Sequence, residues 1–199
     1  NPSTHVVLVD CKNAFNTIRR QAIAEVLCDT PCLSPLNSLF NAFYVAQSEL
    51  AVRGPTAESR VIMSTEGVRQ GDVLGPLFFC VAMRPAIERT QTLFATRHPN
   101  LDISMHLYMD DITLVGTEEA CIACFKLLKH ELEEGLSLMV NTSKTVTTSL
   151  AISAALSCAH DVCPRVLGAF VGRTPAVEKV ILDREPLRHA SLFHRLPLL

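Results

Sequence analysis

The sequence lacks any long apolar run, and this absence excludes a membrane-spanning helix. A helix that crosses a bilayer needs about 20 consecutive apolar residues, and no stretch of the 199 residues approaches that length. Internal repeats and low-complexity tracts are absent as well. With 48% hydrophobic and 19% charged residues, the composition is that of a globular chain. Its length allows one substantial core, or a domain with an appendage.

A net excess of basic residues is also missing. The formal net charge is −2, so the chain as a whole has no electrostatic footprint for nucleic acid. The charge is unevenly distributed, because residues 1–164 hold 12 Lys/Arg against 17 Asp/Glu, whereas residues 165–199 hold 6 against 3. This mildly basic tail indicates either a polyanionic partner or an ordinary solvated face.

Neither an initiator Met nor a signal-peptide pattern opens the sequence. It begins with NPST and enters a strand-like segment, HVVLVD, at residues 5–10. From this start we expect a piece of a longer protein.

The eight cysteines are compatible with disulfides, with buried thiols or with a metal site. Cys80, Cys121 and Cys124 stand in apolar, periodic segments, which favours buried reduced thiols in an intracellular protein. An alternative is a structural zinc site built from Cys121 and Cys124 together with Cys158, His160 and Cys163. Cys121 and Cys124 lie at helical spacing among apolar residues, so we expect them to pack in the core.

The order of elements indicates the fold class. Periodicity predicts helices at 19–27, 36–46, 76–96, 118–134 and 186–199, and strands or extended segments at 5–10, 49–54, 60–67, 106–116, 141–150 and 165–173. The segments at 49–54 and 60–67 form a predicted hairpin. Strands and helices do not alternate regularly, which favours an α+β fold with an antiparallel sheet and helices packed on one face.

Two adjacent aspartates, Asp110 and Asp111, interrupt an apolar strand-like segment. Strand, tight turn and strand is the simplest structure, with the aspartates at the turn. Asp10 ends another predicted strand, so the three carboxylates converge at one sheet edge if these strands are neighbours. Converging carboxylates repel and require a cation. Their hard oxygens select Mg²⁺ or Mn²⁺, and two such ions about 3.5–4 Å apart activate an attacking oxygen and stabilise a leaving one. The alternative is that each carboxylate faces solvent or forms a salt bridge.

The aspartate pair belongs to a series of four motifs. In chain order they are D-C-K-N-A-F (10–15), G-V-R-Q-G-D-V-L-G-P (67–76), Y-M-D-D (108–111) and G-L-S-L-M-V-N-T-S-K-T (135–145). In this order and spacing they resemble the palm of reverse transcriptases, most closely the non-LTR retrotransposon type, over roughly residues 5–172. The segment 167–172 is similar to the family's primer-grip hairpin.

The resemblance implies a polymerase palm over residues 1–172 with partial fingers-side elements, followed over 173–199 by the start of a truncated connection or thumb. The fingers that precede the palm in the family are missing. The implied activity is RNA-directed DNA synthesis, in which a nucleotidyl group passes from a dNTP to the 3′-hydroxyl of a DNA primer on an RNA template. Two Mg²⁺ or Mn²⁺ ions are the implied cofactors.

The same resemblance implies the catalytic roles of individual residues. Asp10 and Asp110 are the metal-bridging carboxylates, and Asp111 is the third acidic group. The main-chain carbonyl of Cys11 completes one coordination sphere, since a backbone oxygen suits Mg²⁺. Lys144 protonates the departing pyrophosphate or orders the active-site loop, with a plain surface lysine as the alternative.

Nucleotide contacts are implied at four positions. Phe15 matches the aromatic steric gate that excludes a 2′-hydroxyl, and its alternative is an ordinary core phenylalanine. Gln70 and Gly71 match the loop along the nucleotide and template, where Gly71 permits close backbone approach. Arg69 lies near phosphate or template, or forms a salt bridge. Asp72 has the simpler interpretation of capping the helix that follows.

The implied partners are the RNA template, the DNA primer, the dNTP and the remaining domains of a parent polyprotein, with no membrane. The implied location is intracellular and nuclear, where the family copies at genomic DNA. Without fingers and thumb, we expect the isolated chain to be inactive or a very poor polymerase. Two alternatives stay open. One is a viral RNA-dependent RNA polymerase palm, which Phe15 disfavours. The other is an inactive relic palm with a structural or nucleic-acid-binding role, although every expected catalytic residue is intact.

Overall fold

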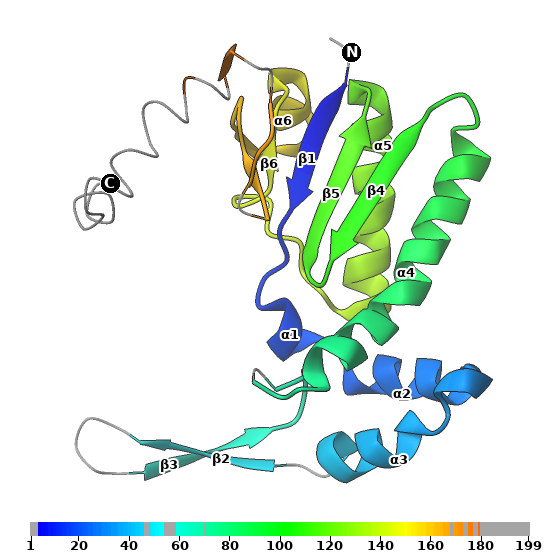
Figure 1. Cartoon of the computed structure of the whole chain (residues 1–199), viewed down its shortest axis with the longest axis vertical. Coiled ribbons are helices and arrows are strands. Elements are labelled where there is room, and N and C mark those ends of the chain that lie inside the picture. Colours follow the sequence, from blue (N-terminus) through cyan, green and yellow to red (C-terminus); the bar gives the residue numbers. More distant parts are fainter. Residues whose placement is uncertain are drawn as a thin grey trace, which may run out of the picture.

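A computed structural model of the chain describes residues 4–45, 48–53, 59–69, 71–167, 169–172, 175, 176 and 179. Its centre is a five-stranded sheet in the order β4-β5-β1-β6-β7, seen in Figure 1. The strands are β1 (His5–Val9), β4 (Ile103–Tyr108), β5 (Asp111–Gly116), β6 (Val146–Thr147) and β7 (Ala159–His160). The first strand of the chain therefore occupies the middle of the sheet.

Antiparallel ladders join β4 to β5, β5 to β1 and β1 to β6, whereas β6 and β7 run parallel. The predicted α+β fold with its antiparallel sheet is confirmed, apart from this last pair. A parallel pair needs a crossover connection, which here contains helix α6 (Leu150–Leu156). The extended segment predicted over 141–150 was largely wrong, since it contains only the two-residue β6 and no helix was expected after it. The Ser149 hydroxyl begins α6 by accepting the N–H groups of Ala151 and Ile152.

Two long helices cover one face of the sheet. They are α4 (Gly75–Arg97) and α5 (Glu118–His130), and α5 continues as the wider turn η3 (Glu131–Gly135). In Figure 1, α5 lies behind β5 and β4, and α4 packs alongside α5. Among the described residues, no helix lies over the face of β1, β5 and β4 that is turned to the viewer. Both helices were predicted from the sequence.

Buried apolar side chains hold the sheet and these helices together. Val7 and Leu114 on the central strands, Phe79 on α4 and Leu128 on α5 are all fully buried. Neighbouring residues on β1 and β5 alternate in direction, so the same strands that contribute these core side chains present their other residues to the uncovered face. The uncovered face is therefore the side on which a large ligand can approach the sheet.

A second group of elements lies below the sheet in Figure 1. It contains α1 (Ala14–Thr17), α2 (Arg20–Asp29), η1 (Pro31–Leu33), α3 (Leu36–Phe40), η2 (Asn41–Val45), β2 (Ser48–Arg53) and β3 (Ser59–Ser64). The predicted β2–β3 hairpin is confirmed. Phe40 and Tyr44 stack at 5.5 Å, and both meet Phe78 of α4 edge-on at 5.2 and 5.6 Å. This aromatic cluster fixes the second group against the start of α4.

Near the C-terminal end, β8 (Arg165–Val166) and β9 (Ala169–Phe170) form a short antiparallel hairpin within the segment predicted to be extended. The helix predicted at 186–199 lies outside the described residues, as does most of the predicted connection over 173–199. None of the helices in the described part of the chain combines the length and apolarity that crossing a bilayer requires.

All eight cysteines are free. Cys121, Cys124, Cys158 and Cys163 are buried, as expected for the first two. The prediction of a buried Cys80 was wrong, because Cys80 is exposed on α4 while its neighbours on both sides pack inward. The described residues give the zinc alternative no support, because no three of their His, Cys, Asp or Glu side chains are arranged to hold a metal ion.

Candidate active site

Asp10, Asp110 and Asp111 lie at the same end of three neighbouring strands. In the β1–β5 ladder Val9 is opposite Ile112, so continuing this register by one residue places Asp10 opposite Asp111. Asp110 occupies the turn that joins β4 to β5. The hydrogen-bonding pattern of one sheet thus brings together carboxylates that are far apart in the sequence.

The turn that carries Asp110 is tight and strained. Tyr108 pairs with Asp111, which leaves Met109 and Asp110 as a two-residue loop. Two-residue hairpin loops require a positive φ, and Met109 adopts φ 56° although it is not glycine. Backbone strain of this kind, which costs about 1–3 kcal/mol, concentrates at functional sites. The Met109 side chain is 37% exposed in this turn, next to Asp110 in the sequence.

The charges of Asp10 and Asp110 perturb ionisable groups close to them. Partial desolvation raises the pKa of the Asp111 carboxyl, and the charges of Asp110 and Asp10 raise it further. Burial, with Asp10 and Asp110 as the next causes, raises the pKa of the Cys11 thiol to about 12. Burial and then Asp110 also raise the pKa of Cys80. The end of the sheet is therefore a region of concentrated negative charge.

The donor chemistry of this region fits a hard divalent cation, because carboxylate oxygens are the ligands that Mg²⁺ and Mn²⁺ prefer. In the described part of the chain no group of three His, Cys, Asp or Glu side chains is placed to hold a metal ion together, and this includes the three aspartates. A Mg²⁺ site that handles phosphate characteristically uses one or two carboxylates and completes its coordination with water and substrate oxygens. The arrangement of the aspartates is compatible with such a site.

The segment after η3 secures Asp10 and brings Lys144 to the same end of the sheet. Cys11 pairs with Val140 in an antiparallel bridge. The N–H of Asn141 donates to the Asp10 carbonyl at 2.7 Å, and the Asp10 N–H donates to Thr145 Oγ1 at 3.3 Å. Lys144 lies in the turn between these contacts with an exposed side chain. The first and fourth sequence motifs are therefore joined directly.

The loop after β3 is fixed to α1, the short helix that carries Phe15. Val68 N–H donates to the Phe15 carbonyl at 2.7 Å, and Gly67 N–H donates to the Ile18 carbonyl at 2.9 Å. Gly67 has φ 70°, and a Cβ there would lie 2.3 Å from the backbone oxygen of Asn16. Only glycine fits this approach, which makes the loop and α1 one unit.

Phe15 packs on the core with one face and is partly exposed. Its ring stacks on Phe79 of α4 at 4.5 Å, so one face packs on the core. The side chain is nevertheless only half-buried, which leaves part of the ring accessible beside the loop. The core alternative and the steric-gate prediction are thus compatible at this position.

Among the other residues of this loop, the structure describes Arg69, Gly71 and Asp72 but not Gln70. Gly71 has φ 88° with open space around its Cα, whereas Gln70 lies outside the described residues. Arg69 donates from Nη2 to the Phe43 carbonyl at 3.0 Å. Asp72 accepts the N–H of Leu74 at 3.0 Å and so stabilises the turn before α4. The N-cap residue of α4 is Leu74, however, and not Asp72.

Comparison with known proteins decides the family. The family model described as reverse transcriptase (RNA-dependent DNA polymerase) matches residues 1–175. The chain belongs to the reverse transcriptase family. It is 29% identical over 149 residues to the retrotransposable element SLACS 132 kDa protein of Trypanosoma brucei gambiense, and the match covers 73% of this chain and 12% of that protein. The predicted recognition as a reverse transcriptase resembling the non-LTR retrotransposon type is confirmed. The RNA-dependent RNA polymerase alternative is not supported.

Solved structures agree on the fold. A telomerase from Candida albicans, in complex with a fragment of telomeric RNA, superimposes with a TM-score of 0.62 at 14% identity, over 86% of this chain and 30% of that chain. An apo telomerase from Candida tropicalis gives a TM-score of 0.61 at 13% identity, over 85% of this chain and 31% of that one. The chain therefore spans less than a third of each protein it matches, and this similarity establishes the palm-like fold.

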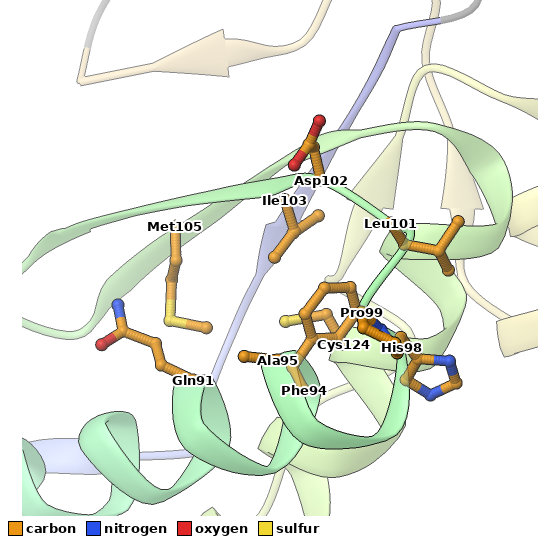
Figure 2. Close-up of a pocket in the computed structure, with 10 residues that line it drawn as sticks. All are labelled: Gln91, Phe94, Ala95, His98, Pro99, Leu101, Asp102, Ile103, Met105 and Cys124. Carbon is orange, nitrogen blue, oxygen red and sulfur yellow. The ribbon is translucent and has the colours of Figure 1, made fainter.

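A cavity of about 370 Å³ lies elsewhere in this reverse transcriptase, between the end of α4 and the start of β4 (Figure 2). Phe94, Ile103, Met105 and Cys124 line it, with His98 and Asp102 near its rim. Asp110 and Asp111 follow the opposite end of β4, after Tyr108. The cavity contains none of the residues that the motifs predicted, so it is separate from the candidate active site.

Two residues that contact the nucleotide loop were missed by the sequence interpretation. Tyr44 donates a hydrogen bond from its hydroxyl to Asp72, and Arg20 donates from Nε to the Gly67 carbonyl at 2.9 Å. Tyr44 fell within the helix predicted at 36–46 and Arg20 within the helix predicted at 19–27, and the sequence interpretation singled out neither of them. A polar group within an apolar helical pattern was the one available signal, and it does not name a partner.

Proposed function

We propose that this chain is the catalytic palm of a retrotransposon RNA-directed DNA polymerase, extending over residues 1–172. The observation that carries the proposal is the convergence of Asp10, Asp110 and Asp111 at one end of the sheet in a member of the reverse transcriptase family. Such an end, open on the uncovered face of the sheet, can accept a primer terminus and a triphosphate together.

In this proposal Asp10 and Asp110 would hold two divalent cations, with Asp111 as the third carboxylate and the Cys11 carbonyl as a backbone oxygen ligand. When bound, Mg²⁺ or Mn²⁺ would promote attack by the primer 3′-hydroxyl and offset the negative charge of the leaving pyrophosphate. The carboxylates would orient the reactants through the cations that they hold, and no covalent enzyme intermediate is needed. The raised pKa of Asp111 supports this role, because the carboxylates are stabilised as anions once a cation is present.

The remaining predicted residues bind the nucleotide. Phe15 excludes the 2′-hydroxyl of a ribonucleotide, and Arg69, Gln70 and Gly71 lie along the incoming dNTP and its template base. Lys144 protonates the pyrophosphate or orders the active-site loop. The attachment of the Gly71 loop to the helix that carries Phe15 supports a shared nucleotide pocket.

We also propose the context in which this palm works. Its partners are an RNA template, a DNA primer, a dNTP and further domains of a parent polyprotein, and it acts inside the cell at nuclear DNA. The family relatives extend well beyond the matched region, so we propose that the 199 residues alone extend primers poorly. The connection over 173–199 belongs to the same proposal.

The test is Mg²⁺-dependent extension of a DNA primer on an RNA template by the longest natural form of the chain. Deoxynucleotide incorporation by the wild type, lost in Asp110→Asn and retained in the matched control Asp102→Asn, supports the proposal. A folded wild type without incorporation supports the inactive relic instead. Activity that survives Asp110→Asn contradicts the assignment of the carboxylates.

A further inference from the structure

The loop that begins at Gly67 and leads into α4 is held by two side chains outside it, Tyr44 and Arg20. We infer that Tyr44 and Arg20 are positioning residues, which keep this loop in the conformation that binds the incoming nucleotide. The inference rests on the proposed function, because it takes Arg69 and Gly71 to lie along the nucleotide. It assigns a role in the reaction to two residues that none of the four motifs contains.

The hydroxyl of Tyr44 contacts the loop on both sides of Gly71. It accepts the main-chain N–H of Arg69 at 3.2 Å, and it donates to the Asp72 carboxylate. The Tyr44 side chain is 1% exposed, and its ring is fixed between Phe40 and Phe78. Because the ring is fixed, the buried hydroxyl holds both of its hydrogen-bond partners in place. Water can take over neither bond unless the loop moves away from the hydroxyl.

Arg20 ties the beginning of the loop to three other elements. Its guanidinium donates to the Gly67 carbonyl at 2.9 Å, to the Tyr44 carbonyl at 3.2 Å, and to the carbonyl and hydroxyl oxygens of Ser64 at 2.9 and 2.8 Å. These acceptors belong to the loop, to η2 and to the last residue of β3. The planar guanidinium fork fixes the directions of all four bonds at once, which a lysine cannot do. Arg20 also lies over the Tyr44 ring at 5.4 Å, so the two anchors support each other.

Gly71 has little packing of its own. It has φ 88°, and a Cβ there would meet open space, so the contacts that anchor Arg69 and Asp72 hold it in place. Loosening an anchor lowers the fraction of molecules in which the loop is ready to bind. The apparent nucleotide affinity then falls in proportion to that fraction. The rate within the bound complex stays the same, because the carboxylates belong to the separate β1, β4 and β5 strands.

The experiment compares Tyr44→Phe with wild type in the longest natural form of the chain, by single-turnover primer extension over a range of dNTP concentrations. Phenylalanine keeps the stacked ring and removes only the hydroxyl. We expect the apparent dNTP dissociation constant to rise about fivefold or more, because the hydroxyl makes two hydrogen bonds and the net loss of one alone corresponds to about fivefold, with the maximal rate within about twofold of wild type. Arg20→Lys should produce a larger rise in the same direction.

The matched control is Thr90→Val. Thr90 is also fully buried, and its hydroxyl donates to the Ala86 carbonyl within α4 at 2.8 Å. It lies fifteen residues beyond Gly75, about 22 Å further along the helix. Thr90→Val should lose comparable thermal stability while leaving the dNTP dissociation constant unchanged, which separates a positioning role from general destabilisation.

Asp72→Asn provides a second test that leaves the buried ring untouched. The asparagine oxygen can still accept the Leu74 N–H, but the bond from Tyr44 loses its charged acceptor, so the dNTP dissociation constant should rise by a smaller factor. An unchanged dissociation constant in both Tyr44→Phe and Asp72→Asn overturns the inference, as does a fall in maximal rate alone. A wild-type protein that folds but extends no primer instead overturns the proposed function.

Discussion

The crowding of Asp10, Asp110 and Asp111 predicts that neutralising one of them stabilises the metal-free protein. In Asp111→Asn the side chain keeps its shape and loses its charge. Like charges opposite each other in a ladder destabilise it by about 0.2–1 kcal/mol, and Asp111 has one such partner, Asp10, with Asp110 adjacent. Because solvent screens exposed charges, we expect a total gain of about 0.5–1 kcal/mol. For a chain of this size the melting temperature then rises by about 1–4 °C.

The assay is thermal unfolding in low-salt buffer with a chelator, followed by titration with Mg²⁺. The raised pKa of Asp111 means that the native protein binds more protons than the unfolded chain between the usual carboxyl pKa and the raised value. Wild-type stability therefore falls as pH rises through that window, and Asp111→Asn removes this contribution. Mg²⁺ should stabilise the wild type more than the variant. The control Asp102→Asn should leave the melting temperature unchanged.

The reasoning is refuted if Asp111→Asn melts at or below the wild-type temperature without metal. It is also refuted if added salt does not shrink the difference between the two proteins, because screening must weaken a repulsion between partly exposed charges.

Three further predictions concern the loop and its supporting helix. Gly67→Ala should destabilise the protein by about 3 kcal/mol or more, because the added Cβ would lie 2.3 Å from the backbone of α1 and φ at this position is 70°. Chemical denaturation measures the free energy of unfolding, and a decrease of less than about 1 kcal/mol contradicts this close packing. Phe15→Val should raise ribonucleotide incorporation relative to deoxynucleotide incorporation, and should lower stability because the stack on Phe79 is lost; unchanged sugar discrimination argues against a steric gate. The pKa of Asp72 is lowered chiefly by the Tyr44 hydrogen bond, so the stability from this bond is present above the usual carboxyl pKa and is lost as pH falls through the lowered one. The stability difference between wild type and Tyr44→Phe should shrink toward the acid end of a pH series without vanishing, because the bond from the Arg69 main-chain N–H does not titrate, and a constant difference counts against the bond to Asp72.

The elements that could be predicted from the sequence are those whose signal is local. The β4–β5 hairpin follows from two apolar segments that flank a polar pair, and α4 from a long periodic pattern after a glycine-rich turn. Helix α6 was missed because its seven residues are too few to establish a period, and its cap, Ser149, resembled the polar residues of an extended segment. The direction of Cys80 was missed for a related reason. A helix buried over much of its surface gives little periodic contrast.

The residues of the candidate site also fall into those with a local sequence signal and those without one. Asp10, Asp110 and Asp111 stand out because acidic side chains are unfavourable at the ends of apolar strands, so each position shows an anomaly within its own segment. Tyr44 and Arg20 show none, since their importance arises from partners that only the folded chain brings near. No local pattern connects a tyrosine in one turn with a carboxylate in another.

The central position of β1 has a consequence for how the protein is made. Among the strands of this sheet it is synthesised before the others, yet its partners β5 and β6 are made only after β4. At roughly 5–20 residues per second, synthesis leaves β1 waiting for about 5–20 s before β5 is available. During that interval its apolar edges are unpaired, and the distant pairing itself closes slowly. Asp10 therefore comes close to Asp110 and Asp111 only late in folding. Chaperones that bind β1 on the nascent chain should raise the yield of folded protein.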